Sequence, residues 1–392
     1  KFAFKFNKII IESFFFPKKE YFKICLKFKL ILFKYSNFFN FDIKENSLSK
    51  DNKRVEFKNL ILKMTNQDKF IQFLLSNLHK DIPRSYVENF DKIKKYFLPF
   101  AQKKKIIFSM FSLFRNDNFK IYLAETKKAG SKYIHTTHGG GLTVQRSYDF
   151  GFLEKISNKI IIWDNNNSMQ KNIFANLSPT LPTIKLKNPK IGNNCSIVFA
   201  EQLKYLNKFP AVLTLDQSIE FFNELIHFVN KLNSEIKSKV KFRATAQVGY
   251  NSVKKFSEIF GEKCIDKPSF KNPFKKTILN SRLIIVTYPQ TTFSEAMYSN
   301  IPTILIIKKN HHQFIGVSLH IFNVLKKNKI AFEDFNEAKT HINKHWKELD
   351  LWWKSKSVQF ARKEFLINFF NVKSDWDREW SDYIYSSKKL LI

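Results

Sequence analysis

The chain is poor in cysteine and contains no long apolar run. Its 392 residues include three cysteines, which are widely spaced and form no CxxC pair. This spacing indicates neither a disulfide framework nor a structural zinc site, and it suits a reducing cytoplasm. The longest apolar stretches, residues 9–16 and 24–33, are interrupted by charged side chains, so neither reaches the length of a membrane-spanning helix.

Signatures of processing and of nucleotide hydrolysis are also missing. No small-residue cleavage site of a signal peptide follows the first residues, and the chain begins with Lys1 and not Met, which leaves the completeness of the N-terminus open. The absence of a P-loop argues against nucleotide hydrolysis. No metal-ligand cluster stands out, so we expect neither a metal site nor a bound cofactor.

Acidic residues are scarce relative to basic ones. The 67 Lys and Arg against 34 Asp and Glu give a net charge of +33, which favours polyanions and acidic surfaces as partners. The lysines are spread along the chain, however, and accompany 44 Phe and abundant Asn and Ile, as A/T-rich codons produce. We therefore expect no specific nucleic-acid partner, and we expect peripheral contact with an anionic membrane.

Strand and helix patterns divide the chain into four predicted regions. Residues 1–100 are mostly helix-like, basic and aromatic. Residues 101–185 alternate strands and helices at βαβ spacing, which predicts parallel strands with right-handed crossovers. After a proline-containing interdomain crossing at residues 179–194, the alternation restarts over residues 186–335, and residues 336–392 form a Trp-rich helical tail. We predict an α/β protein with two Rossmann-like domains facing a cleft and a tail packing back across it.

Three of the nine glycines are consecutive and follow a predicted strand. This strand, residues 133–137, leads into His138, and Gly139, Gly140 and Gly141 come next. Glycines offer no side chain for packing, but they let backbone N–H groups approach a ligand closely. Because open α/β sheets bind ligands at the carboxyl ends of their strands, we expect an active site at this turn.

A second motif follows a buried strand predicted at residues 283–286. After a proline turn and Gln290, Thr291 and Thr292 stand where a helix is expected to begin. Helix N-termini bind anions through free N–H groups, which favours a phosphate or ribose site. The competing interpretation is structural, because Thr292 and Glu295 are spaced as a capping box.

The order of these motifs resembles a GT-B-type transferase. More closely, residues 100–385 are similar to a family of bacterial transferases linked to surface-carbohydrate biosynthesis. The shared features are the HGG turn, the segment Glu154-Lys-Ile-Ser-Asn158, the Tyr-Pro-Gln-Thr-Thr turn and the Trp-rich tail. The sequence departs from the family pattern at Asn158, where Asp is expected, and at Asp164, where a Gly-type turn is commoner.

This resemblance implies an enzyme that transfers a sugar from a nucleotide-activated donor to a surface-polysaccharide acceptor. The first domain would bind a saccharide or lipid-linked acceptor, and the second would bind the nucleotide-sugar co-substrate. His138 matches the base that deprotonates the acceptor hydroxyl, and His135, inside the strand, is the alternative. The remaining expected site residues are Glu154 as a second catalytic group, Gly139–Gly141 as a backbone cradle, and Gln290, Thr291, Thr292, Glu295 and Arg243 as donor contacts.

Several of these expectations have structural or functional competitors. Glu154 is alternatively an exposed helix residue, and Arg243 is alternatively a solvated cation at a strand end. A polyol-phosphate transferase of the same fold at the membrane surface, or a nucleic-acid-binding protein, stays open as another function. For the transferase, we expect a cytoplasmic location with peripheral contact at the inner face of the membrane.

Overall fold

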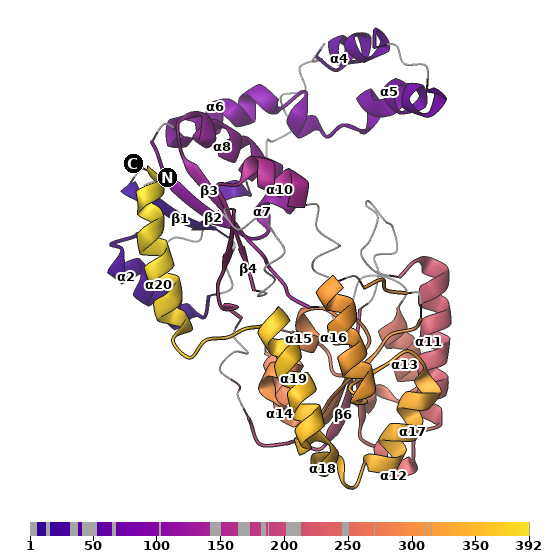
Figure 1. The fold of residues 1–392 in the computed structure, drawn as a ribbon. Helices are drawn as coiled ribbons and strands as arrows, with labels where there is room; N and C mark the ends of the chain where they lie inside the picture. The colour runs from indigo at the N-terminus through magenta and orange to yellow at the C-terminus, as the bar shows by residue number, and fades with distance from the viewer. Residues whose placement is uncertain are drawn as a thin grey trace. The chain divides into compact units, whose positions relative to one another are not determined.

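The computed structural model describes residues 6–12, 16–31, 38–40, 53–64, 68–101, 103–141, 150–163, 173–181, 186, 188–200, 213–244, 251–269, 271–309, 311–314 and 316–391. These residues contain two five-stranded sheets with helices around them (Figure 1). The chain divides into two compact units. The first comprises residues 1–138, 153–161 and 380–392, and the second comprises residues 139–152 and 162–379.

The first sheet has the strand order β1-β2-β3-β4-β5. Its strands are β1 (Ile9–Glu12), β2 (Ile106–Ser109), β3 (Lys132–Thr136), β4 (Lys159–Ile162) and β5 (Phe174–Asn176). Strands β1 to β4 pair in parallel, and nearly all of their residues are buried, as expected when both faces of a sheet are covered. The crossover from β2 to β3 runs through α7 (Ser112–Arg115) and α8 (Asp117–Lys128), which confirms the predicted βαβ unit.

Strand β1 shows that the expected domain boundary at residue 100 is wrong. Ile9 pairs with Ile106 and Glu12 with Ser109, so the N-terminal region supplies a strand of the first sheet. Glu12 and its partner Ser109 are 97 residues apart in the chain, so no local sequence pattern reveals this pairing. The helices between the two strands are α2 (Lys18–Lys27), α4 (Lys53–Leu62), α5 (Lys69–Asp81) and α6 (Phe90–Ala101).

The second sheet has the strand order β10-β9-β8-β6-β7, and all its described pairs are parallel. The strands are β6 (Asn194–Phe199), β7 (Val240–Ala244), β8 (Ser281–Val286), β9 (Thr303–Ile306) and β10 (Ala331–Phe332). The chain adds β7 on one side of β6 and the later strands on the other, so the strand order reverses between β6 and β8. Such a switch point is where doubly wound sheets bind ligands, outside the carboxyl ends of the strands.

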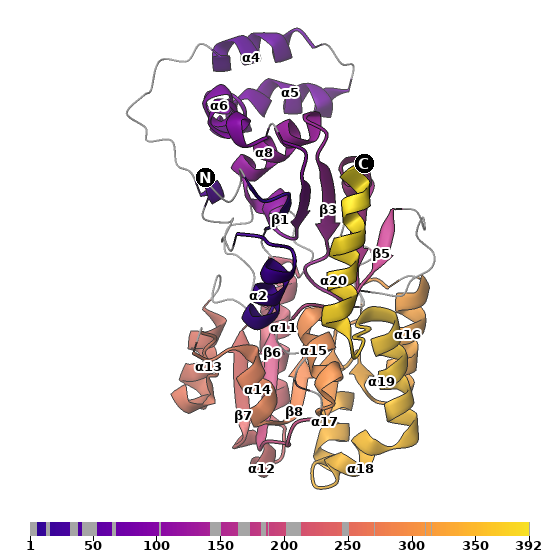
Figure 2. The same ribbon diagram turned by 90° about the vertical axis from the view of Figure 1, so that its left-hand side faces the viewer.

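Helices cover both faces of the second sheet (Figures 1 and 2). One face packs against α11 (Leu215–Asn230), α12 (Ser234–Lys237), α13 (Ser252–Phe260) and α17 (Phe335–His345). The other packs against α14 (Phe274–Asn280), α15 (Thr291–Ser299), α16 (Gly316–Lys327), α18 (Leu349–Lys354) and α19 (Lys356–Phe369). Two parallel α/β sheets and a helical tail confirm the predicted fold class. That the sheets face a cleft stays a prediction.

The helical tail contributes to both units. Helices α17 to α19 belong to the second unit, whereas residues from Trp380 onward, in α20 (Trp376–Ser387), belong to the first. The Trp380 ring packs edge-on against Phe16 at 5.2 Å between centroids. Residues 179–194 lie within the second unit, so the expected interdomain crossing there is wrong. All three cysteines are free and buried, and no described helix is both long and apolar enough to span a membrane.

Candidate active site

His138 follows the carboxyl end of β3 in the first unit. Its half-buried ring lies 4.4 Å from the ring of Phe111, centroid to centroid, and Phe111 comes two residues after the end of β2. The guanidinium of Arg115 lies over the Phe111 ring, 5.0 Å from its centroid. Two neighbouring strand ends therefore position this imidazole.

The alternative base, His135, is 2% exposed inside β3. Its Nδ1 lies 3.0 Å from the Tyr133 hydroxyl oxygen. Burial, and secondarily the nearby His138, lower the pKa of His135 to about 3, so its imidazole is neutral near pH 7. A buried neutral histidine is poorly placed to touch an acceptor, which leaves His138 as the more accessible of the two.

A buried polar row that we did not predict lies beside His135. Glu12, Ser109 and His135 occupy aligned positions in β1, β2 and β3. The Ser109 hydroxyl donates to a Glu12 carboxylate oxygen at 2.9 Å, and both residues are fully buried. Burial raises the pKa of the Tyr133 phenol, and the Glu12 charge raises it further. The available signal was Glu12 itself, a carboxylate that directly follows three isoleucines.

The glycine turn packs against the start of α15, within the second unit. The Gly140 N–H donates to Thr291 Oγ1 at 3.2 Å, and Ser294 Oγ donates to the Gly140 carbonyl at 3.3 Å. A Cβ on Gly139 would come within 2.5 Å of Thr291 Oγ1, and one on Gly141 within 2.4 Å of the Pro289 carbonyl oxygen. The two predicted motifs therefore meet. The premise that the glycines are not needed for packing is wrong, because side chains there would clash with this turn.

Helix α15 begins directly after the carboxyl end of β8, beside the switch point. Its N-cap is Gln290, whose side chain makes no capping hydrogen bond, so the expected capping box of Thr292 and Glu295 is not formed. Thr292 Oγ1 instead accepts from the buried Tyr288 hydroxyl at 2.5 Å. The first turn of a helix has backbone N–H groups without intrahelical partners, which makes its start a potential anion site.

Arg243 lies in β7 and is 6% exposed, so it is not the solvated cation that the competing interpretation expected. Its Nη1 is 3.3 Å from an Asp266 carboxylate oxygen, and its Nη2 donates to the Asn272 carbonyl at 3.0 Å. Nη1 has no hydrogen-bond partner among the described residues. A buried guanidinium with an N–H group that makes no hydrogen bond can donate it to a bound anion.

The other expected residues fall into different surroundings. Glu154 is half-buried on α10 (Phe150–Ile156), in the part of this helix that belongs to the first unit, and it forms no ion pair or hydrogen bond with another described residue. The Asn158 side chain accepts from the Tyr133 N–H at 2.9 Å, a bond that Asp would also form. Asp164 lies outside the described residues. In the part of the chain that the structure describes, no cluster of three His, Cys, Asp or Glu could hold a metal ion.

The C-terminal end of α15 is held by the tail. The half-buried Arg362 on α19 donates to the carbonyls of Met297 at 2.6 Å and Tyr298 at 3.1 Å. The Trp353 indole N–H, on α18, donates to Asn300 at 2.9 Å from its side-chain oxygen. The Trp353 ring is buried in the same apolar cluster as this end of α15. A cation at the C-terminus of a helix also complements its dipole, so the tail fixes the helix that carries Thr291 and Thr292.

A doubly wound sheet with a helix start at its switch point is an arrangement at which α/β proteins bind their ligands. The chain belongs to the LIC12162 family of transferases, whose model matches residues 1–384. This membership confirms the resemblance to a transferase family and the prediction of an enzyme. None of the curated proteins matches the chain.

Solved structures give distant likenesses. The chain is similar to HepE from Anabaena in complex with UDP and glucose, at 11% identity over 82% of this chain and 90% of that one, with a TM-score of 0.45. Acinetobacter baumannii MurG matches at 10% identity over 76% and 77% of the two chains, with a TM-score of 0.41. The UDP-GlcNAc 2-epimerase of Methanocaldococcus jannaschii matches at 13% identity over 75% and 80%, with a TM-score of 0.43.

Proposed function

We propose that the protein is a glycosyltransferase that moves a sugar from a nucleotide-activated donor to a surface-polysaccharide acceptor, either a saccharide or a lipid-linked one. The observation that carries this proposal is the position of α15. Its N-terminus follows β8 beside the strand-order reversal and packs against the glycine turn. A helix start at this position suits the diphosphate of a nucleotide-sugar.

The donor phosphates bind at Gln290, Thr291 and Thr292, where the N–H groups and hydroxyls of the two threonines meet the positive end of the helix dipole. Glu295, one turn into α15, accepts from a ribose or sugar hydroxyl. Arg243 donates to a further oxygen of the donor, because its Nη1 forms no hydrogen bond with a described residue. The helix dipole, these hydroxyls and Arg243 thus stabilise the leaving nucleotide.

His138 acts as the base in this proposal. It takes the proton of the acceptor hydroxyl while that oxygen forms a bond to the anomeric carbon of the donor sugar. The bond between this carbon and the donor phosphate breaks, and its electron pair leaves with the nucleotide. Gly139, Gly140 and Gly141 place backbone beside the reacting sugar, and Glu154 is the second candidate for an acid or base role.

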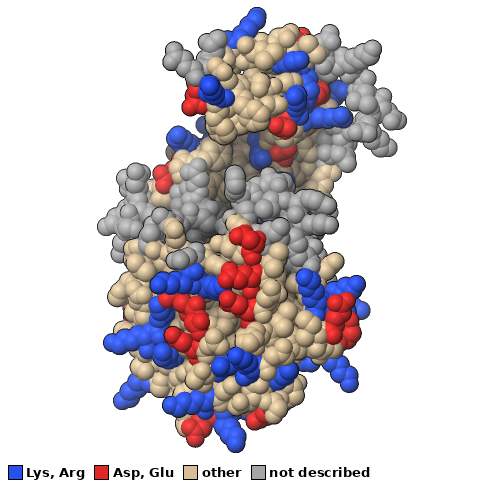
Figure 3. All heavy atoms as spheres, turned by 90° about the vertical axis from the view of Figure 1, so that its right-hand side faces the viewer, with Lys and Arg blue, Asp and Glu red and all other residues tan. Residues whose placement is uncertain are grey.

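The basic surface supports peripheral contact of a cytoplasmic enzyme with the inner face of an anionic membrane, where lipid-linked acceptors are found. It gives less support to nucleic-acid binding. Figure 3 shows Lys and Arg interspersed with Asp and Glu over the face that it draws, and not gathered into a groove of one sign. A nucleic-acid site needs such a clustered basic footprint.

The test is thermal-shift screening of the full chain with CMP-, UDP-, GDP- and dTDP-linked sugars and, in parallel, duplex DNA. We expect stabilisation by donors of one nucleotide class, and little effect of DNA at physiological salt. Stabilisation by DNA alone, with a steep salt dependence, would overturn the proposal in favour of nucleic-acid binding. The screen also includes a nucleotide-activated polyol phosphate, and stabilisation by this donor alone would move the chemistry to polyol-phosphate transfer.

A further inference from the structure

The hairpin of helices α4 and α5 exposes an unusual amount of apolar surface. No residue of α5 is buried, and the side chains of Phe70 and Phe73 are 66% and 62% exposed. With Leu74 they are spaced as i, i+3 and i+4, so they share one face of the helix. The exposed large apolar residues of the hairpin are Val55, Leu60, Leu62, Met64, Phe70, Ile71, Phe73, Leu74 and Leu78. Soluble monomers rarely leave so contiguous a set uncovered.

The hairpin is nevertheless tied to the first unit at one end. Arg54 forms a bidentate ion pair with Glu88, and its Nη2 also donates to the Ile82 carbonyl at 3.1 Å, just beyond α5. Lys53 pairs with Asp91 on α6 at 2.5 Å. Polar contacts therefore hold the base of the hairpin, while its apolar side chains remain in solvent. This arrangement presents a built surface and not a frayed end.

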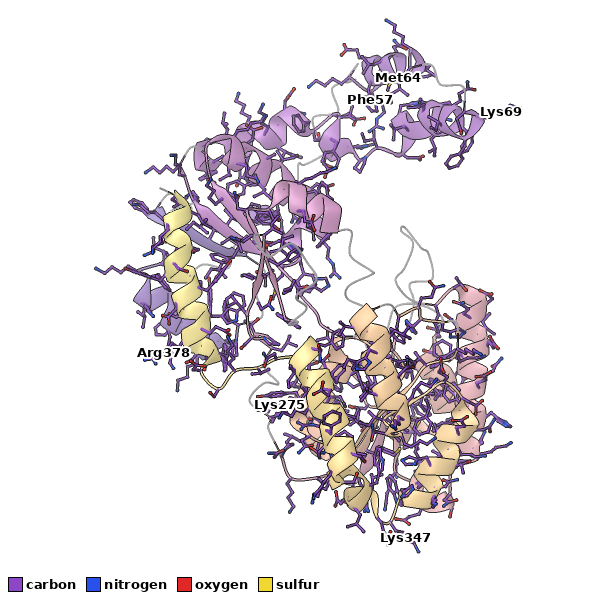
Figure 4. The ribbon with its side chains drawn as sticks, in the orientation of Figure 1. Phe57, Met64, Lys69, Lys275, Lys347 and Arg378 are labelled. Carbon is purple, nitrogen blue, oxygen red and sulfur yellow. The ribbon has the colours of Figure 1, made fainter. Side chains whose placement is uncertain are left out.

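Lysines stand among these apolar side chains. Lys63 and Lys69 flank the connection between the helices and are neighbours in sequence of Met64 and Phe70. Figure 4 labels Met64 and Lys69 at this end of the hairpin. Both lysines are exposed, and neither forms an ion pair with a described residue. Asp68, the acidic residue between them, is engaged as the N-cap of α5, where its side chain accepts from two backbone N–H groups. Apolar side chains beside unpaired cations fit an anionic interface.

The same charge argues against a second copy of the chain as the occupant. Two identical hairpins would bring Lys63 and Lys69 of each copy against one another, which costs energy at a partly apolar interface. The net charge of +33 would add long-range repulsion. An anionic lipid surface instead accepts both features, because aromatic rings enter the headgroup region while long lysine side chains reach the phosphates.

We propose that the α4–α5 hairpin is the membrane-docking element of this protein. Phe70 and Phe73 insert into the interface of an anionic bilayer, and Lys63 and Lys69 contact its headgroups. This inference rests on the peripheral membrane contact proposed above and makes its site specific. It does not depend on the donor or on the catalytic base.

The test is flotation of the full chain with vesicles of phosphatidylcholine containing a quarter phosphatidylglycerol, and with pure phosphatidylcholine vesicles, at physiological salt. We expect binding to the anionic vesicles only. Phe70→Ser combined with Phe73→Ser is expected to weaken this binding by about tenfold or more, because two aromatic rings that would be buried in the bilayer interface are lost. Lys63→Glu with Lys69→Glu should weaken it at least about tenfold and flatten its salt dependence.

The matched control is Leu351→Ser with Phe360→Ser, which removes two apolar side chains of the second unit that are 69% and 59% exposed. We expect this variant to float like the unchanged protein. An equal loss of vesicle binding in the Phe70/Phe73 variant and in the Leu351/Phe360 control would overturn the proposal. So would the absence of flotation for the unchanged protein. So would a dimer in solution that only the hairpin variant loses, with vesicle binding intact. Donor thermal shifts of every variant separate this outcome from a failure of the proposed transferase chemistry.

Discussion

The two sheets differ in where they carry polar groups at their strand ends. In the first sheet, Glu12, Ser109 and His135 are aligned across three neighbouring strands and are buried. In the second sheet, comparable positions are filled by Val198, Val286 and Leu305, which are equally buried but apolar. The row ends in a charged residue only at β7, where Arg243 pairs with Val198, and the other polar groups of this sheet come in the turn that follows β8.

Strand order accounts for much of this difference. The second sheet reverses its order between β6 and β8, so the connections diverge and leave room for a ligand beyond the strand ends. The described strands of the first sheet follow one another in sequence without such a reversal. Its ionisable groups lie inside the sheet, where each one costs stability unless it is hydrogen-bonded. The comparison predicts chemistry at the first sheet and ligand binding at the second.

Replacement of His138 separates these two tasks and has the largest expected effect. His138→Ala should lower turnover by about a hundred- to ten-thousand-fold, because a general base is lost, and should leave donor binding nearly intact. Initial rates measure the first quantity, and donor-induced thermal shifts measure the second. Near-normal turnover in a well-folded His138→Ala variant would move the base to His135 or Glu154.

Gly141 probes the packed turn at the second sheet. With φ at +148° and a Cβ position 2.4 Å from the Pro289 carbonyl oxygen, Gly141→Ala should cost about 2–5 kcal/mol of unfolding free energy. Gly261 is a matched control, since its φ is +86° but nothing lies within 4 Å of its Cβ position. Gly261→Ala should cost only about 1 kcal/mol. Equal costs in denaturant titrations would show that the turn yields to a side chain.

The alternating pattern made the second unit readable from sequence. The strand expected at residues 283–286 lies in β8, and the helix expected to begin at Thr291 and Thr292 is α15, which begins at Thr291. Short apolar runs and intervening amphipathic helices are local features, so a window of sequence contains them. The positions of His138 and Thr291 at strand ends followed from the same reasoning.

Long-range pairing could not be read in this way. Glu12 looked like an interruption of an apolar run, because its partner Ser109 lies 97 residues away. The contact between Gly140 and Thr291 spans 151 residues, so the glycines seemed available for a ligand when they also fit against α15. The capping box failed for a local reason: the helix begins at Thr291, and the Thr292 hydroxyl is engaged by Tyr288.

Acid titration tests how much stability the protein loses by burying His135 in the polar row of the first sheet. Burial holds the pKa of His135 at about 3, below its ordinary value of 6.5. Between these values the unfolded chain takes up a proton that the folded protein resists, so the free energy of unfolding falls as the pH drops below 6.5. From pH 7 to pH 4, His135 should contribute a loss of about 3 kcal/mol.

The measurement compares denaturant titrations of the unchanged protein and His135→Asn at both pH values. The destabilisation caused by His135→Asn should shrink by that amount at pH 4, since the variant no longer resists protonation. An unchanged cost of His135→Asn would mean that the imidazole is not buried in solution.

Thr292 has the smallest expected effect and addresses the second sheet alone. Because Gln290 and not Thr292 is the N-cap, the cost of removing the Thr292 hydroxyl must come from the buried Tyr288, whose hydroxyl loses its 2.5 Å acceptor. Thr292→Val should therefore cost about 1 kcal/mol of unfolding free energy and, under the proposed function, also weaken donor binding.

In a Tyr288→Phe background the stability cost of Thr292→Val should nearly vanish, since no hydroxyl donor is left unsatisfied. The loss of donor affinity should persist there, because the Thr292 hydroxyl would contact the phosphates directly. A stability cost that stays the same in both backgrounds would restore a structural role for Thr292 independent of Tyr288, and an unchanged donor affinity would remove Thr292 from the donor site.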